Sequence, residues 1–305
     1  MITKIEIDGF KTFRNFKMEF SPFTVIAGTN ASGKSNLFDA LNLLSRLAET
    51  DLKAAFSEQR ADALELFTKF NDDKYSEHIS FSVEMLVNKR VKDNWGGEIE
   101  LKYTRLIYKL KIKRVPNPKG IEDLCIANEE LVNYKHGDDI WVSKYIPKKT
   151  MDFWRPKVST EKGGISYIYT EEKNGVPTII VPQDGTTGNK KEFPAININQ
   201  TVLSGFNSID FPHVLGAKEE MKSWKFLQLN PEHLRKPSPY LAKDFITSTG
   251  ENMASVLQRL KFTNDYLLKD ISRTLNRLLP NFIEVEVVDD KANKQFIITL
   301  KNEDG

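Results

Sequence analysis

The sequence predicts an α/β fold built around a phosphate-binding loop, with a β-rich lobe inserted behind it. Three observations support this prediction. The run GTNASGKS at residues 28–35 matches the pattern G-x-x-x-x-G-K-[ST]. A short apolar run at residues 23–27 precedes the loop as a candidate strand, and apolar residues at helical spacing follow it from residue 36 onward. Residues 77–194 then contain several alternating, strand-like runs separated by turn signals.

The chemistry of the loop follows from its residue types. Gly28 and Gly33 allow backbone angles that a Cβ would forbid, so the loop can wrap closely around a phosphate. The Lys34 ammonium can reach β- and γ-phosphates, which makes Lys34 the candidate catalytic residue, and the Ser35 hydroxyl is the candidate Mg²⁺ ligand. The predicted nucleotide-binding residues are Gly28, Asn30, Ala31, Ser32, Gly33, Lys34, Ser35 and Asn36. The alternative, a glycine-rich turn by chance, requires strand, motif and helix to coincide.

Composition indicates an ordinary globular protein. The chain has 305 residues, of which 28% are charged and 40% hydrophobic, and its net charge of +2 gives no argument for nucleic-acid binding. The single cysteine, Cys125, excludes an internal disulfide, and its apolar neighbours favour a small buried side chain over a reactive thiol. No apolar run approaches membrane-helix length, and the alternating, acid-containing N-terminus does not resemble a signal peptide. We therefore expect a cytoplasmic protein without a membrane partner.

The first 20 residues read as two strands rich in aromatic side chains. Lys11, Arg14 and Lys17 alternate with these aromatic residues. Such cations can face the nucleotide or form the solvated side of a half-buried sheet, and the alternation itself favours the solvated side. Arg14 is kept as a candidate nucleotide contact.

The remaining elements follow in order along the chain. We expect a helix over residues 36–50 and a second over 52–70, then a β-rich lobe with strands at 79–85, 103–112, 140–142, 166–169 and 178–181. Helix is expected again at 218–226, 250–261 and 267–279, a strand at 226–229, and a hairpin from 283 to 300. The predicted division is residues 1–75 for the first part of a nucleotide-binding head, 76–200 for the lobe and 201–305 for a helical segment with the hairpin.

Residues 10–47 resemble the heads of SMC/RecF-like ATPases of the ABC superclass. The residues that carry this resemblance are GFKTF at 9–13 and GKSNLFDAL at 33–41. More narrowly, residues 52–67 with Arg60, 224–235 and 250–257 resemble segments of the AAA-type stand-alone ATPases found in bacterial anti-phage systems. The resemblance implies an ABC/SMC-head type of P-loop NTPase that uses ATP and Mg²⁺. It also implies a homodimer or higher homo-oligomer around sandwiched nucleotides, and control of an effector such as a nuclease.

The chain also departs from this family. It contains no Leu-Ser-Gly-Gly-like signature and no apolar strand ending in Asp-Glu; the nearest string, residues 287–290, lies in the predicted hairpin. We therefore expect an N-terminal portion of a longer ATPase, with the hydrolytic glutamate beyond Gly305. The family also implies a glutamine near the nucleotide. Gln200 is the candidate, and a polar residue at a strand end is the equally open alternative.

Two functions remain open on the sequence. One is an ATP-hydrolysing head that dimerises and drives an effector. The other is a nucleotide-gated scaffold without significant hydrolysis, whose lobe binds DNA or protein through basic residues with aromatic side chains nearby. These residues are Lys109, Lys111, Lys113, Arg114, Lys144, Lys148, Lys149 and Arg155, with Trp141, Tyr145 and Trp154. Solvated strand faces explain the same charges. A transporter ATPase fits the lobe poorly, and the Asp-Asp pairs lie in predicted turns rather than in a nuclease centre.

Overall fold

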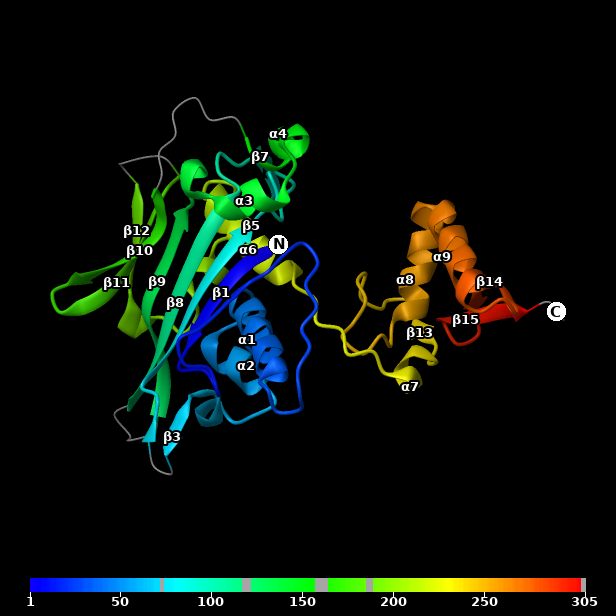
Figure 1. Cartoon of the computed structure of the whole chain (residues 1–305), viewed down its shortest axis with the longest axis horizontal. Helices are drawn as coiled ribbons and strands as arrows, with labels where there is room; N and C mark the ends of the chain where they lie inside the picture. The colour runs from blue at the N-terminus through cyan, green and yellow to red at the C-terminus, as the bar shows by residue number, and fades with distance from the viewer. Residues whose placement is uncertain (72–73, 117–121, 157–163, 185–188, 303–305) are drawn as a thin grey trace. The chain divides into compact units, whose positions relative to one another are not determined.

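The chain forms two compact units. The computed structural model describes residues 1–71, 74–116, 122–156, 164–184 and 189–302 (Figure 1). Unit 1 spans Met1–Trp224 and unit 2 spans Lys225–Gly305. The boundaries expected at residues 75 and 200 therefore lie inside unit 1. Strands before and after residue 75 belong to one sheet, and the helix at residues 212–223, after residue 200, packs against the helix at residues 34–47 and against that sheet.

An antiparallel sheet of eight strands organises unit 1. The strand order is β12-β11-β10-β9-β8-β5-β1-β2. The bounds are β1 Ile2–Asp8, β2 Phe16–Glu19, β5 His78–Leu86, β8 Arg105–Pro116, β9 Glu122–Asn133, β10 Ser166–Lys173, β11 Val176–Pro182 and β12 Lys190–Pro194. Strand β5 lies between β1 and β8, with Ile7 opposite Phe81 and Phe81 opposite Leu110. The N-terminal strands and the expected lobe are thus parts of a single sheet.

One face of this sheet is apolar and the other is polar. Successive residues of β1 and β5 alternate between buried and partly exposed positions, as the period of a strand requires. Ile5, Ile7, Val83, Tyr108 and Leu110 are among the buried residues of the apolar face. This alternation positions the core on the side where the helices lie.

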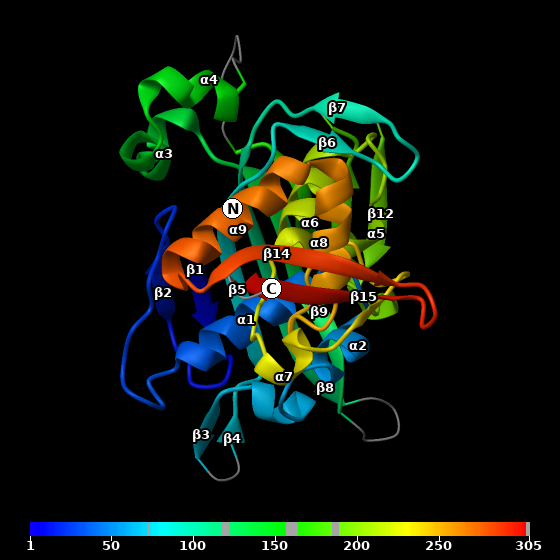
Figure 2. The ribbon, with the colours of Figure 1, turned by 90° about the vertical axis from the view of Figure 1, so that its right-hand side faces the viewer.

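Helices α1 (Lys34–Leu47), α2 (Leu52–Ser57) and α6 (Pro212–Ser223) lie in front of the sheet in Figure 2. Leu37, Ala40, Leu41 and Leu44 of α1 recur at helical spacing and are buried. Because α1 begins in the phosphate loop, this packing fixes the loop's helix against the sheet.

A buried polar cluster holds the far end of α1. The Thr201 hydroxyl donates to Leu47 O over 2.8 Å, at the last residue of α1. The short helix α5 (Val202–Gly205) follows, and the carboxylate of Glu129 on β9 accepts from the N–H groups of Val202 (2.7 Å) and Leu203 (2.8 Å). A carboxylate at a helix N-terminus is favourable both as a hydrogen-bond acceptor and by charge.

Smaller elements complete unit 1. They are the strand pairs β3 (Lys69–Asn71) with β4 (Lys74–Tyr75) and β6 (Arg90–Lys92) with β7 (Glu98–Glu100), and the helices α3 (Ile140–Tyr145) and α4 (Met151–Trp154). Single 3₁₀ turns are η1 (Ala63–Leu66), η2 (His136–Asp138), η3 (Lys148–Thr150) and η4 (Ala195–Asn197).

Several sequence predictions of local structure are wrong. Residues 23–27 form no strand and leave Phe23 84% and Val25 75% exposed, because no described strand pairs with them. Residues 226–229 likewise form no strand. Residues 140–142 belong to helix α3, whose first turn is capped by Asp139. The helix expected over 52–70 ends at Ser57, and the 3₁₀ turn η1 follows it.

Unit 2 has its own small core. It contains α7 (Pro231–Leu234), β13 (Ser238–Pro239), α8 (Met253–Thr263), α9 (Asp265–Leu278), β14 (Phe282–Asp290) and β15 (Gln295–Asn302). The strand order is β13-β15-β14, and Leu268, Val285 and Val287 are buried between helix and sheet. The two late helices and the hairpin are confirmed. Among the described residues of either unit, no helix is both long and apolar enough to span a bilayer.

Candidate nucleotide-binding site

The phosphate loop leads directly into helix α1. Gly33 takes the N-cap position in a left-handed conformation, with φ +91°, and Leu37 N donates to Gly33 O over 3.1 Å. No side chain caps this helix N-terminus, and its first turn contains no acidic residue. Free N–H groups at the start of a long helix form an anion-binding site.

The Lys34 ammonium lies over the loop itself. Its Nζ donates to the carbonyl oxygens of Gly28 at 2.8 Å and Thr29 at 2.6 Å. It also approaches the Ser32 hydroxyl at 3.4 Å. Neutral carbonyl oxygens are weaker acceptors than a phosphate, so a nucleotide phosphate can replace them as the hydrogen-bond partner of Lys34.

The glycines leave the space that a phosphate needs. A Cβ on Gly28 would lie 2.8 Å from Ser32 Oγ and 3.9 Å from Lys34 Nζ, so any larger residue there would crowd the polar groups of the loop. Ala31 also has a positive φ of +64°, so the loop curls back on itself. Asn30, Ala31, Ser32 and Ser35 are exposed. The curled loop, the uncapped helix and the ammonium fit a nucleotide phosphate, and the accessible Ser35 hydroxyl fits Mg²⁺ ligation.

The turn between β1 and β2 packs against the start of α1. Asn36 Nδ2 donates to Thr12 Oγ1 over 2.8 Å, and Lys11 Nζ lies 2.6 Å from Asp39 Oδ2. Gly33 brings the loop close to this turn, since a Cβ there would lie 3.7 Å from the Phe13 ring. One side of the loop is therefore walled by residues 11–13.

A cavity of about 610 Å³ opens on the other side of this turn. It is lined by Lys11, Thr12, Arg14, Glu65, Phe67, Thr68, Lys69 and Tyr75. Arg14 lies over the Phe70 ring, 4.6 Å from its centroid, and donates to Lys69 O over 3.4 Å. The cavity combines aromatic surface with three cations and meets the loop through Thr12, so it can accept the base or sugar of a nucleotide.

Family comparison agrees with this geometry. A family model described as an AAA ATPase domain matches residues 1–174, which contain the loop, α1 and most of the sheet. The chain belongs to the AAA ATPase domain family. Its predicted P-loop NTPase fold is thereby confirmed, although the strand expected just before the motif does not form.

No curated protein matches the chain. A solved structure from work on the structural biochemistry of ATP-driven dimerization and DNA-stimulated activation of SMC ATPases is similar at 23% identity, over 41% of this chain and 69% of that chain, with a TM-score of 0.28.

In this AAA ATPase domain protein, Gln200 lies away from the phosphate loop. Its neighbours Asn199 and Thr201 bond to Leu52 N and Leu47 O, at the C-terminal end of α1. Lys34 lies at the opposite end of this 14-residue helix, roughly 20 Å away along its axis. The structure therefore does not bring Gln200 together with the loop.

The basic and aromatic residues considered for DNA contact divide into two groups. Trp141 is buried with its indole N–H bonded to Phe20 O, Arg155 binds Asp139, and Arg114 lies between the Phe67 and Tyr75 rings. These three are structural side chains. The exposed members include Lys109, Lys113, Lys148, Lys149 and Trp154.

Sequence reasoning missed the partners that position the AAA ATPase domain's loop. Thr12 with Asn36 and Lys11 with Asp39 join the β1–β2 turn to α1. The alternation of Lys11 with aromatic residues leaves open whether its side chain faces the nucleotide or the solvent, and nothing in the local pattern points to Asp39. A left-handed Lys11, with φ +47°, aims its side chain at α1, and sequence periodicity carries no sign of such a turn.

Proposed function

We propose that this chain is the ATP-binding part of an ATPase head that hydrolyses ATP with Mg²⁺. Lys34 holds the phosphates, Ser35 ligates Mg²⁺, and the loop from Asn30 to Lys34 cradles the phosphate oxygens. Catalysis in this class is mainly positioning and charge stabilisation, so these residues supply binding and orientation. Bound Mg²⁺ neutralises charge on the β- and γ-phosphates.

One observation carries the proposal. The N-terminus of α1 has no capping side chain and no acidic first turn, and the Lys34 ammonium, bonded to Gly28 O and Thr29 O, lies beside it. The N–H groups at the start of the helix lack a side-chain partner, and together with the lysine they can bind an anion.

We extend the proposal to assembly and output. Two copies dimerise around nucleotide, and closure of the pair controls a partner effector, most simply a nuclease, in the cytoplasm. The support is the family resemblance of residues 9–13 and 33–41 to SMC/RecF-like heads and their anti-phage relatives.

The test compares Lys34→Ala with the parent protein. We expect the parent to bind ATP and Mg²⁺ in calorimetry and the variant to lose at least tenfold in affinity, since a charge-assisted phosphate contact is removed. Lys53→Ala is the matched control, because Lys53 is an exposed lysine on α2 that pairs with Asp123. A Lys34→Ala protein that binds and hydrolyses ATP like the parent contradicts the proposal.

A groove on the open face of the sheet is the candidate contact surface for the second function, a nucleotide-gated scaffold that binds DNA. The groove has a volume of about 630 Å³ and crosses β1, β2, β5, β8 and β9. Lys17, Lys109 and Lys111 line it together with Glu6, Asp8 and Glu130. Lys17 pairs with Glu6 at 3.1 Å and Lys109 with Glu130 at 3.2 Å, so DNA would have to compete with these ion pairs. DNA binding there predicts an affinity that falls steeply with salt and falls further in Lys109→Ala/Lys111→Ala. A flat salt response, or no binding to a 30-base-pair duplex, removes this candidate.

A further inference from the structure

The segment that carries the phosphate loop is fixed at its two ends. Phe20 at the end of β2 is 8% exposed and Leu37 in α1 is 3% exposed, and no residue between them is buried. Residues 21–32 therefore have little packing of their own, whereas Gly33 and Asn36 already contact the β1–β2 turn. The position of the loop relative to the sheet depends on what holds Phe20 at one end and α1 at the other.

Phe20 is held by two hydrogen bonds of its backbone. Its N–H donates to Thr3 O on β1 over 2.8 Å, and its carbonyl oxygen accepts from Trp141 Nε1 over 2.5 Å. In the described part of the chain, the other hydrogen bonds of residues 21–27 are local ones among Ser21, Phe23 and Thr24. The bond from Trp141 is thus the last link to the rest of unit 1 before the loop.

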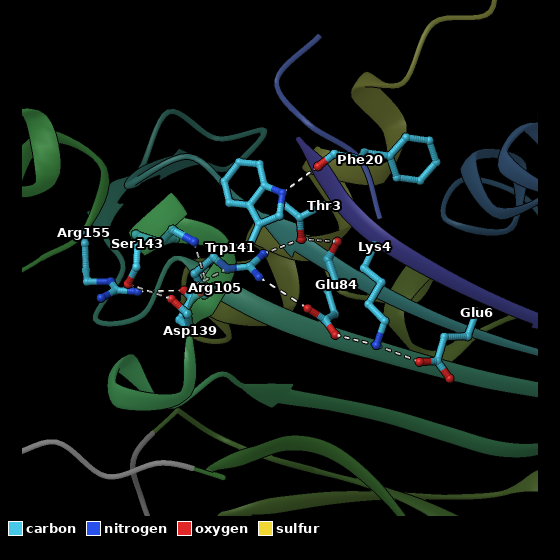
Figure 3. A network of polar contacts seen from close by, with 11 residues as sticks. Thr3, Lys4, Glu6, Phe20, Glu84, Arg105, Asp139, Trp141, Ser143 and Arg155 are labelled. Atoms are coloured by element: carbon cyan, nitrogen blue, oxygen red, sulfur yellow. Dashed lines mark hydrogen bonds and ion pairs between the residues drawn. The ribbon is translucent and has the colours of Figure 1, made fainter. Parts of the chain in front are cut away.

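Trp141 reaches Phe20 from a distant part of the chain. It lies on helix α3, and its indole is 6% exposed, with the Tyr145 ring at a centroid distance of 5.1 Å. The Arg105 guanidinium lies 5.5 Å from the indole centroid (Figure 3). A buried aromatic ring that packs against a second, tilted ring and against a cation has little freedom, so its N–H is aimed at one acceptor.

Arg105 joins both groups that bind Phe20. It is 2% exposed on β8, its Nη1 donates to Thr3 Oγ1 over 2.6 Å, and its Nε lies 3.0 Å from Asp139 Oδ2. Thr3 supplies the carbonyl that accepts from Phe20 N–H, and Asp139 starts the helix that carries Trp141. Figure 3 shows Arg105 bonded to Thr3 and Asp139, and beside them the Trp141 indole bonded to the Phe20 carbonyl oxygen.

Asp139 makes this network rigid. Its carboxylate binds Arg105 and Arg155, at 3.0 and 2.7 Å, and accepts from Val142 N in the first turn of α3. Glu84 on β5 lies 3.4 Å from Arg105 and supplies a second negative charge. Two guanidinium groups and two carboxylates balance each other, so the buried charges stabilise one arrangement of β1, β8 and α3.

We propose that Trp141 is a positioning residue for the phosphate loop, and that helix α3 sets the nucleotide affinity of the protein through the indole N–H bond to Phe20. This inference rests on the proposed function, since it assigns a positioning role at the same site. Because Trp141 on α3 is bonded to Phe20, a shift of α3 displaces Phe20. Phe20 directly precedes the segment that leads to Lys34.

The first test is Trp141→Phe, which keeps an aromatic ring and removes the N–H donor. We expect its dissociation constant for ATP with Mg²⁺ to rise about three- to tenfold, as loss of one buried hydrogen bond implies. Trp154→Phe is the matched control, because its ring is 39% exposed on α4 and its polar contact is a backbone carbonyl that accepts from Thr104.

Amide hydrogen exchange without nucleotide separates positioning from general damage. In Trp141→Phe we expect faster exchange in residues 21–33 and unchanged exchange in β5 and β8. Uniformly faster exchange across unit 1, or no change in residues 21–33, overturns the inference. This readout needs no bound nucleotide.

A third measurement keeps Trp141 and removes the other indoles. In Trp95→Phe/Trp154→Phe/Trp224→Phe, Trp141 is the single tryptophan, and ATP with Mg²⁺ should change its fluorescence; adding Lys34→Ala should abolish that change. A parent protein that binds no ATP contradicts the proposed function. A parent that binds ATP while Trp141 fluorescence stays constant and Trp141→Phe binds equally well contradicts the inference alone.

Discussion

At the scale of single residues, the ion pair between Lys11 and Asp39 ties the β1–β2 turn to α1. Both side chains are largely shielded, at 14% and 13% exposure, and their charged atoms lie 2.6 Å apart. We expect Asp39→Asn to lower the free energy of unfolding by about 1–2 kcal/mol, because a shielded charge-assisted hydrogen bond is weakened. Urea denaturation measures this loss.

The control for this pair lies in unit 2. Lys269 and Asp265 form an exposed i, i+4 pair on α9 with a similar distance of 2.6 Å. Exposed pairs contribute little, so Asp265→Asn should lower the free energy of unfolding clearly less than Asp39→Asn does. Equal losses in the two variants would show that Asp39 does no more than an ordinary surface carboxylate.

Glu129 gives a pH dependence of known sign. Complete burial raises its pKa from 4.5 to about 7, against hydrogen bonds from Leu203, Val202 and Tyr108 that lower it. Between these two pH values the folded protein keeps the proton and the unfolded chain loses it. Stability therefore falls as pH rises through this window, by up to roughly 3 kcal/mol from this group.

Glu129→Gln isolates this contribution. Glutamine does not titrate, so the difference between parent and variant in denaturation midpoint should change between about pH 4.5 and 7. The variant should also be less stable than the parent at low pH. The NH₂ group of glutamine would replace one of the two oxygens that accept hydrogen bonds from Val202 N and Leu203 N, and it cannot accept. A constant difference across the window means that Glu129 keeps an ordinary pKa.

The same scale shows what the sequence could predict of the site. Residues 28–35 stand out in the sequence because the motif is local, and their roles at a nucleotide stay a prediction. The contacts of Asn36 with Thr12 and of Asp39 with Lys11 join positions 24 and 28 residues apart. Such pairs depend on how the turn folds back on α1, and local periodicity contains no information about that.

At the scale of elements, α3 shows how a cap overrides a short apolar pattern. Residues 140–142 suggested a strand, yet Asp139 accepts from Val142 N and starts a helix. The buried carboxylate also pairs with Arg105 and Arg155. Three neighbouring apolar residues fit a strand or a helix equally well, so the capping side chain and its distant arginine partners decided the outcome.

Asp139→Ala should therefore be strongly destabilising. Removal of the carboxylate leaves Arg105 buried without its closest counter-ion, which costs roughly 3–5 kcal/mol in the free energy of unfolding. Asp51→Ala is the comparison, because Asp51 caps α2 through Ala54 N at 2.9 Å and should cost about 1 kcal/mol. Chemical denaturation of both variants measures the difference, and similar losses would reduce Asp139 to a helix cap.

Strand prediction failed where pairing, rather than side-chain pattern, decides. Residues 23–27 have the composition of a buried strand, but the backbone groups of a strand need neighbouring strands as partners. In the described part of unit 1, β1 already pairs with β2 and β5, so the sheet has no open place beside β1 for this segment. The flanking strands and α1 were predictable because their own periodicity matched their burial.

At the scale of the whole molecule, one sheet contains neighbouring strands that lie far apart in the sequence. The alternation of residues 2–8 and 79–85 was visible, and both are strands. Their adjacency was not visible, because it is created by contacts between positions about 75 residues apart, such as Ile7 with Phe81. A three-part division along the chain was therefore the natural expectation, although one core spans residues 1–224.

This division leads to a prediction about a fragment. The phosphate loop, the β1–β2 turn, the cavity beside it and the buried network around Arg105 all lie in unit 1. A unit with its own core can fold alone.

We expect a protein of residues 1–224 to unfold cooperatively and to bind ATP with Mg²⁺ within about twofold of the affinity of the full chain, since every proposed binding residue is retained. Calorimetry on both proteins, each with its Lys34→Ala variant as the non-binding reference, measures this. A cooperatively folded fragment that binds more than about tenfold more weakly would assign part of the nucleotide affinity to residues 225–305.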